Sequence, residues 1–169
     1  MTIQTRELTY ESAGVTFNST MAWDDTLGPR PAVLVAPTWA GSTDFERAQA
    51  LRLAGLGYVG LAVDMYGGGA VGADKEECTA LMTPVMSDRA MLQARIAAAV
   101  DAIRMQPESL DQPVAAIGFC FGGLCVLDLA RSRQDIAGVV SLHGLLLPAD
   151  NLPEPDLQAK VLDLHGYDD

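Results

Sequence analysis

The stretch IGFCFGG, residues 117–123, places a cysteine between two glycines, each of which is two residues away. It continues the apolar run that begins at residue 114, a pattern typical of a buried strand. A strand that ends in this way usually turns sharply into a helix, and the residue at the apex is pushed outward as an exposed nucleophile. The stretch therefore predicts a strand-turn-helix element with Cys120 at its apex.

Strand and helix patterns alternate on both sides of this element. Apolar runs predict strands at 32–36, 58–63, 113–118, 136–142 and 160–164. Helical patterns lie between them, at 43–57, 74–86, 87–105 and 121–131. The imperfectly alternating segments 5–10 and 15–23 predict an antiparallel hairpin at the N-terminus. We expect one α/β domain over residues 1–169, with a mostly parallel sheet that is covered on both faces.

Two of the helices have specific expected faces. The sequence from Thr43 to Glu46 matches a capping box, and the helix that follows has Ala48, Leu51 and Ala54 among its candidates for the inward face. The helix at 87–105 has apolar residues at helical spacing, and these predict its buried face: Leu92, Ile96, Ala99, Val100 and Ile103.

The turn at Cys120 has the features of an activated thiol. A helix that begins after Cys120 would point its unpaired amides and the positive end of its dipole at the sulfur, which favours thiolate over thiol. Gly118 and Gly122 allow strand and helix to approach closely, and Gly123 removes bulk beside the apex. The amide of Phe121, the residue after the nucleophile, would be one donor of an oxyanion hole. A buried core cysteine is the competing interpretation, and the flanking glycines favour the nucleophile.

Composition excludes several other classes. The formal net charge of -11, with no basic cluster, disfavours nucleic-acid binding. No apolar run is long enough to cross a membrane, and the N-terminus lacks the pattern of a secretory signal, so we expect a cytoplasmic protein. The three cysteines show neither a disulfide framework nor metal-ligand spacing. We expect no cofactor, and we assign Cys78 and Cys125 to packing, with a Cys120–Cys125 redox pair as an alternative.

Four runs of the sequence carry a family resemblance. They are AVLVAPTWAGSTDFERAQALRLAGLGYVGLAVDMYGGG at 32–69, AAIGFCFGG at 115–123, VVSLHG at 139–144 and KVLDLHGYDD at 160–169. Together they resemble the dienelactone hydrolase family, a cysteine branch of the α/β-hydrolase fold, from about Ala32 to Asp169. The resemblance implies a three-layer fold with a mostly parallel sheet and N-terminal antiparallel strands.

The resemblance also implies a Cys-His-Asp triad that cleaves esters or lactones through an acyl-thioester. Cys120 matches the nucleophile. Asp169 matches the acid in the loop after the last strand, with Asp168 as the runner-up. The second oxyanion amide comes from the loop after the strand at 32–36 and matches Trp39, and Phe121 supplies the first.

Two positions depart from the family pattern. The family usually has a glutamate at the position of Thr38, where it takes part in activating the thiol, and threonine cannot act as a carboxylate. An arginine that holds the substrate carboxylate in the founding enzymes aligns with Gly68. We therefore expect a substrate other than a dienelactone acid, with an uncharged ester favoured.

The sequence contains two histidines, His143 and His165, and both match ordinary fold positions in the family. The family continues beyond the position of Asp169 to its catalytic histidine. We therefore expect this chain to be the N-terminal portion of a longer hydrolase, with a C-terminally incomplete sheet whose open apolar edge would favour aggregation. Structural imidazole is the favoured role for both histidines, and His143 is a minor candidate for the base.

Three functional hypotheses follow. The first is a thiol hydrolase that acts on a small carboxylic ester or lactone, with Cys120, Asp169 and the amides of Trp39 and Phe121 as its site. The second is a noncatalytic binding or regulatory member of the same fold, since fold alone does not decide function. The third is a redox-sensing thiol at Cys120. The identity of the substrate and the oligomeric state stay open.

Overall fold

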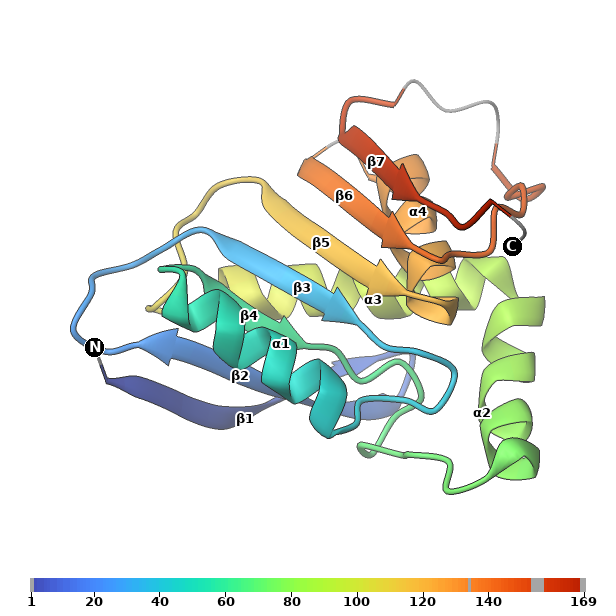
Figure 1. Ribbon diagram of the computed structural model, residues 1–169, viewed down its shortest axis with the longest axis horizontal. Coiled ribbons are helices and arrows are strands. Elements are labelled where there is room, and N and C mark those ends of the chain that lie inside the picture. The colour runs from blue at the N-terminus through green and yellow to red at the C-terminus, as the bar shows by residue number, and fades with distance from the viewer. Residues whose placement is uncertain (1, 134, 153–156, 168–169) are drawn as a thin grey trace.

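A computed structural model describes residues 2–133, 135–152 and 157–167 of the chain. Within these residues, three N-terminal strands are followed by a mixture of helices and strands, as Figure 1 shows. The elements are β1 (Ile3–Ser12), β2 (Val15–Asp24), β3 (Ala32–Ala36), α1 (Asp44–Gly55), β4 (Val59–Ala62), α2 (Lys75–Ser87), α3 (Arg89–Arg104), β5 (Val114–Phe119), α4 (Phe121–Ser132), β6 (Ile136–Leu142) and β7 (Lys160–Leu164).

The strands of the described residues form one sheet in the order β1-β2-β4-β3-β5-β6-β7. β1 pairs with β2 and β2 with β4 in antiparallel fashion, and the pairs from β4 to β7 are parallel. The predictions of an N-terminal antiparallel hairpin and of a mostly parallel sheet are therefore confirmed. Because the parallel strands run in one direction, their carboxyl ends meet at the edge of the molecule that faces α2 (Figure 1).

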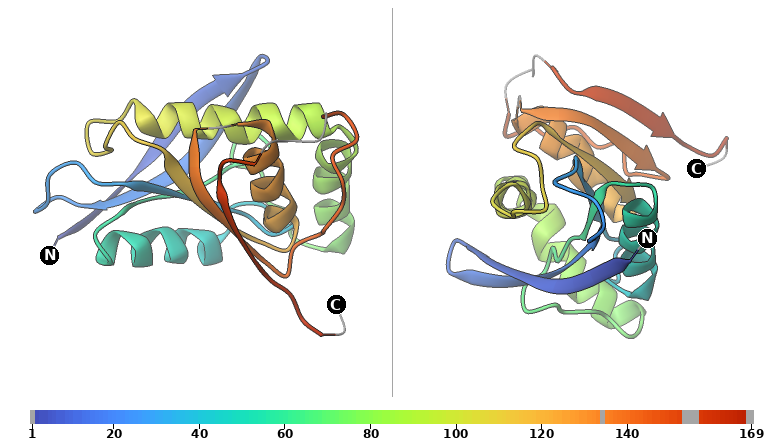
Figure 2. Two further views of the ribbon diagram at one scale, coloured as in Figure 1. Left: turned by 90° about the horizontal axis from the view of Figure 1, so that it is seen from above. Right: turned by 90° about the vertical axis from the view of Figure 1, so that its left-hand side faces the viewer.

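Helices lie on both faces of the sheet (Figure 2). α1 packs on β2, β3 and β4, and α4 packs on β3, β5 and β6 together with α3. This three-layer arrangement is that of the α/β-hydrolase fold. No helix in the described part of the chain has both the length and the apolar character needed to cross a membrane.

The inward face of α1 differs in part from the prediction. The capping box at Thr43 is present and Ala54 is buried, but Ala48 is exposed and Leu51 is 42% exposed. Ala50 takes the inward place instead. A Cβ at Gly60 of β4 would come closer than 3.0 Å to the backbone of Ala50, so helix and strand nearly touch. This close approach turns the small alanines toward the sheet and leaves the larger leucine outside.

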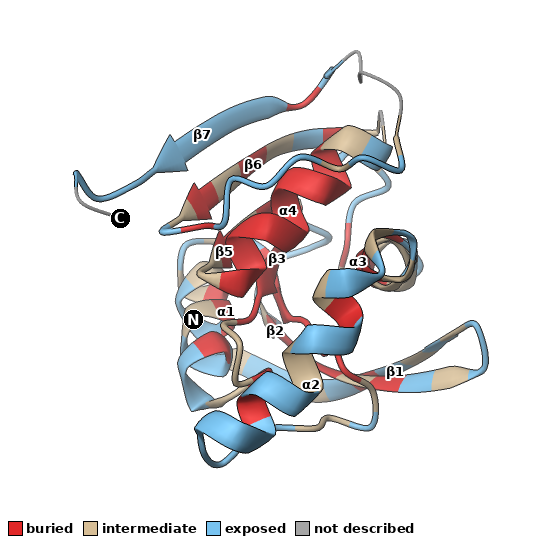
Figure 3. Ribbon diagram, turned by 90° about the vertical axis from the view of Figure 1, so that its right-hand side faces the viewer, coloured by how far each residue is buried: buried red, intermediate tan, exposed pale blue. Residues whose placement is uncertain are grey.

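The predicted face of α3 is confirmed, since all five of its apolar residues are fully buried. α4 is buried over ten of its twelve residues, which places it in the middle of the core (Figure 3). β7 contrasts with it, because every residue of that strand is exposed. The larger part of the core thus lies between the sheet and the helices α3 and α4, and a smaller cluster of alanines lies between α1 and the sheet.

Candidate active site

Cys120 stands between the end of β5 and the start of α4, so the predicted strand-turn-helix element is confirmed. Its backbone has φ 54° and ψ -114°, a conformation that non-glycine residues rarely adopt. Its N–H donates to the Leu142 carbonyl at 3.0 Å, and its carbonyl accepts the Gly123 N–H at 2.9 Å. These contacts hold Cys120 in a strained conformation at the N-cap of α4, where its side chain is half-buried rather than part of the core.

The glycines around Cys120 make this turn possible. A Cβ at Gly118 would come closer than 3.0 Å to the backbone of Gly122, and one at Gly122 would do the same to the backbone of Ala36. The first and second glycines therefore let β5, α4 and β3 approach each other, as predicted. A Cβ at Gly123 would lie 2.5 Å from the Cα of Gly144. The third glycine thus makes room for the turn after β6 rather than for the thiol.

The loop 37–43 after β3 carries Trp39. The Thr38 N–H donates to Oε1 of Glu46 at 3.0 Å, and the Thr43 N–H donates to Oε2 of the same carboxylate at 2.8 Å. Glu46 is fully buried, although it belongs to α1. The Glu46 carboxylate thus ties the backbone at both ends of this loop to α1.

Tyr66 contacts both residues expected to form the oxyanion hole. Its hydroxyl donates to the Trp39 carbonyl at 2.7 Å, and its ring stacks on that of Phe121 with centroids 6.1 Å apart. Burial, and to a lesser extent the negative potential of the nearby thiols Cys125, Cys78 and Cys120, raises the pKa of Tyr66 well above its usual 10.0. The phenol therefore stays protonated and remains a hydrogen-bond donor.

The amides of Trp39 and Phe121 have the free hydrogens that the predicted role requires. Among the described residues, no group is found to accept either N–H. Phe121 is the first residue of α4, where amides have no partner within the helix. Both residues could therefore donate to a substrate oxygen, which is what the sequence predicts for them.

The glycine-rich loop after β4 is organised by a buried carboxylate. Asp64 is 1% exposed and accepts the N–H groups of Tyr66, Gly67 and Gly69 within the loop, and that of Asn18 on β2. Gly68 lies in the same loop with φ +61°, and nothing lies within 4 Å of where its Cβ would be. The position that matches arginine in the founding enzymes is therefore a glycine with open space beside it.

The two histidines follow neighbouring strands. His143 has φ 54° directly after β6, its N–H donates to the Leu164 carbonyl at 2.8 Å, and its ring centroid is 6.2 Å from that of His165. Asp169 and its runner-up Asp168 lie outside the described residues, so the acid stays a prediction. Within the described part of the chain, no cluster of residues suited to a metal ion is found.

The remaining cysteines are packing residues, as predicted. Cys125 is fully buried in α4, and burial raises the pKa of its thiol well above the usual value. Cys78 is 4% exposed, and its sulfur contacts the Gly72 carbonyl at 3.5 Å.

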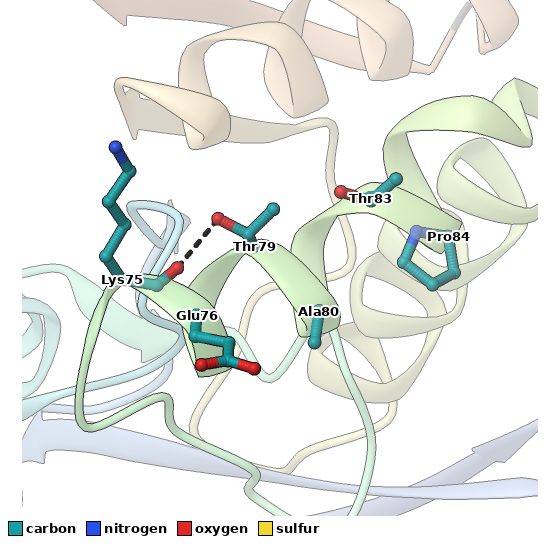
Figure 4. A pocket seen from close by; sticks show the side chains of 6 residues that line it. All are labelled: Lys75, Glu76, Thr79, Ala80, Thr83 and Pro84. Carbon is teal, nitrogen blue, oxygen red and sulfur yellow. Dashed lines mark hydrogen bonds between the residues drawn. The ribbon is translucent and has the colours of Figure 1, made fainter.

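A separate hollow of about 670 Å³ lies along the outer side of α2 (Figure 4). It is lined by Lys75, Glu76, Thr79, Ala80, Thr83 and Pro84, all of which are exposed and none of which is a predicted site residue. The chemistry is therefore expected at the elbow and not in this hollow.

Sequence reasoning missed two residues of the site. The sequence identifies Glu46 as part of a capping box. Its second contact, with the Thr38 amide, links α1 to the preceding loop across eight residues, and no local pattern predicts it. Tyr66 lies in the glycine-rich loop, and nothing in its local pattern points to Trp39 or Phe121. One signal was available in the sequence: Tyr66 is followed by three glycines, so it is the large, rigid side chain of that part of the loop.

Comparison with known proteins gives a consistent result. A family model described as the dienelactone hydrolase family matches residues 17–169. A solved protein called m3DLH is 40% identical, with a TM-score of 0.90 over 97% of this chain and 69% of its own. A dienelactone hydrolase-like promiscuous phosphotriesterase from metagenomic libraries is 37% identical, with a TM-score of 0.92 over 99% of this chain and 70% of its own.

A relative of known sequence from an animal also matches part of this chain. An uncharacterized protein from Caenorhabditis elegans is 42% identical over 84 residues, which are 48% of this chain and 53% of that protein. The chain thus matches about half the length of this curated relative.

Proposed function

The chain belongs to the dienelactone hydrolase family, and from this membership we propose that it hydrolyses small carboxylic esters or lactones with Cys120 as the nucleophile. The observation that carries the proposal is the strained turn at the N-terminus of α4, which presents the Cys120 thiol beside the unpartnered amide of Phe121. A core cysteine would need neither the strain nor the two glycines, Gly118 and Gly122, that let strand and helix meet at this turn.

In the proposed reaction, the Cys120 sulfur bonds to the carbonyl carbon of the substrate, and the π electron pair moves to the oxygen. The Trp39 and Phe121 amides donate hydrogen bonds to that oxyanion. The pair then returns and the bond from carbon to the alkoxy oxygen breaks. The alkoxide takes up the proton that the thiol lost and leaves as the alcohol. Water next attacks the thioester, which gives the carboxylic acid and regenerates the thiol.

The surroundings of Gly68 support an uncharged substrate. A bound carboxylate would need a cation, and position 68, where the founding enzymes have arginine, is glycine here. The likeness to a promiscuous phosphotriesterase adds neutral phosphotriesters as a second substrate class, in which the sulfur would attack phosphorus instead of carbon. A nitrophenyl acetate and a neutral nitrophenyl phosphotriester are suitable probes, because both release the same chromophore.

Two measurements test the role of Cys120. We expect iodoacetamide near neutral pH to alkylate Cys120 well ahead of the buried Cys78 and Cys125, as read by peptide mass spectrometry. We also expect Cys120→Ala to reduce ester turnover by about 1000-fold or more, because removing a nucleophile removes the covalent route. Cys78→Ala, which deletes a buried thiol of α2, is the matched control and should retain turnover.

The alternative is a noncatalytic binding or regulatory member of the family, for which the threonine at position 38 is the motivating observation. It predicts that the full-length protein shows no turnover that depends on Cys120. A redox-sensing thiol predicts reversible oxidation at Cys120 without an acyl-enzyme. Trapping of an acyl group on Cys120 by mass spectrometry would contradict both.

A further inference from the structure

Three consecutive peptide groups around Trp39 each have a fixed partner. The peptide before Thr38 donates its N–H to Glu46 at 3.0 Å. The peptide between Thr38 and Trp39 accepts the Gly41 N–H at its carbonyl, at 3.1 Å. The peptide after Trp39 accepts the Tyr66 hydroxyl at 2.7 Å. Because a trans peptide is planar, with its N–H opposite its carbonyl, these contacts together set the direction of the Trp39 N–H.

Among the partners of these three peptide groups, Tyr66 is the residue that contacts both Trp39 and Phe121. Its side chain lies in the interior, its ring stacks on Phe121 at an interplanar angle of 18°, and a Cβ at Gly41 would touch the ring at 3.3 Å. One rigid side chain is therefore wedged between the loop 37–43 and the first residue of α4. A tyrosine loses little conformational freedom on ordering, so it can fix both neighbours at low entropic cost.

The backbone of Tyr66 is itself held by a buried carboxylate of its own loop and by a side chain of α3. Its N–H donates to Oδ1 of the buried Asp64 at 2.9 Å. Its carbonyl and that of Met65 accept Nη1 of Arg95, on α3, at 3.3 and 2.8 Å. The backbone of Tyr66 is thus anchored to Asp64, at the start of its own loop, and to α3.

We infer that Tyr66 is a positioning residue, whose hydroxyl and ring fix the Trp39 and Phe121 amides at the separation that an oxyanion requires. The inference rests on the proposed function. Tyr66 acts through the backbone of Trp39 and the ring of Phe121. A hole that is preorganised in this way stabilises charge in the transition state without reorganising during the reaction, and therefore raises kcat more than it lowers KM.

The test is Tyr66→Phe in the full-length protein, because this change removes the hydroxyl and keeps the ring on Phe121. We expect kcat for a nitrophenyl ester to fall about 10- to 100-fold, since a misplaced oxyanion donor has an effect of this size. KM should change by no more than about twofold. The rate of Cys120 alkylation by iodoacetamide should not change, because displacement of iodide develops no oxyanion.

Two further variants separate positioning from stability. Tyr10→Phe removes a phenol hydroxyl whose oxygen is 3.0 Å from Ser19 Oγ, away from the loop 37–43. We expect this variant to lose about as much Tm as Tyr66→Phe and to keep its kcat. Glu46→Gln leaves one acceptor oxygen for two backbone donors, and should lower kcat with alkylation unchanged.

Each outcome has one meaning. An unchanged kcat in Tyr66→Phe, or parallel losses of kcat and of alkylation, would overturn the inference. Absence of Cys120-dependent turnover in the unsubstituted protein would overturn the proposed function as well, and so the two failures are distinguishable.

Discussion

Cys120 combines a reactive side chain with a backbone conformation that suits glycine better. A non-glycine residue at φ 54° and ψ -114° carries strain of about 1–3 kcal/mol. The proposed function accounts for this strain, because the turn projects the side chain away from the core. The residue that is best for stability at this position is therefore not the residue that is best for the proposed chemistry.

We predict that Cys120→Gly is more stable than Cys120→Ala by about 1 kcal/mol, because both variants lose the thiol and only glycine relieves the strain. The free energies of unfolding in urea measure the difference. Ala94→Gly, at an exposed position inside α3, is the matched comparison and should instead destabilise by about 1 kcal/mol. A glycine variant that is less stable than the alanine variant would show that the turn is relaxed.

At the scale of elements, an ion-pair network joins α3 to the segment after α4. Asp135 accepts Arg133 Nη2 at 2.6 Å and also pairs with Arg104 of α3, and Arg133 bonds Asp101 of α3 at 2.7 Å. Hydrogen bonds from the Arg133 guanidinium, and then from Arg104, hold the pKa of Asp135 well below its usual 3.8. The charged form of Asp135 is therefore favoured by folding.

A depressed pKa in the folded state means that the unfolded chain binds the proton more readily. The contribution of Asp135 to stability is then present above about pH 4 and is lost as the pH falls toward its lower folded pKa. We expect the unfolding free energy of Asp135→Asn to decline less steeply below pH 4 than that of the unsubstituted protein. Asp111→Asn, at an exposed site, controls for removal of a surface carboxylate. Equal acid slopes for all three proteins would contradict this prediction.

At the scale of the whole molecule, the sheet is covered unevenly. Figure 3 shows α4 almost entirely buried, whereas β7 stays exposed along its length. A hollow of about 450 Å³ is lined by largely apolar residues of β5, β6 and β7, among them Val161 and Leu162, which are 45% and 50% exposed. An exposed apolar edge strand is a template for pairing between chains.

We predict that the 169-residue chain self-associates through this surface. Leu162→Lys should lower the weight-average mass measured by light scattering, because a charge in the hollow opposes apolar contact. Leu56→Lys changes an isolated leucine that is 67% exposed at the end of α1 and should leave the association unchanged. A monomeric unsubstituted chain, or equal masses for both variants, would argue against the prediction.

Most of the fold could be read from local patterns. The strand at 136–142, the strand at 160–164, the capping box at Thr43 and the buried face of α3 depend on residues close together in sequence, and all agree with the structure. The inward face of α1 was misjudged because the alanines are selected by contact with Gly60, which lies beyond the helix in the sequence.

The sequence by itself determined the strand-turn-helix at Cys120 and the residues that flank it, because strand period, glycine spacing and helix start are local properties of the chain. Only the tertiary structure decided how the oxyanion loop is held. Glu46 reaches back to Thr38 from α1, and Tyr66 crosses from the loop after β4 to Trp39 and Phe121. Such contacts join separate segments of the sequence, and no local sequence pattern relates these segments to each other. The contacts form only once α1, β4 and α4 have packed together in the fold.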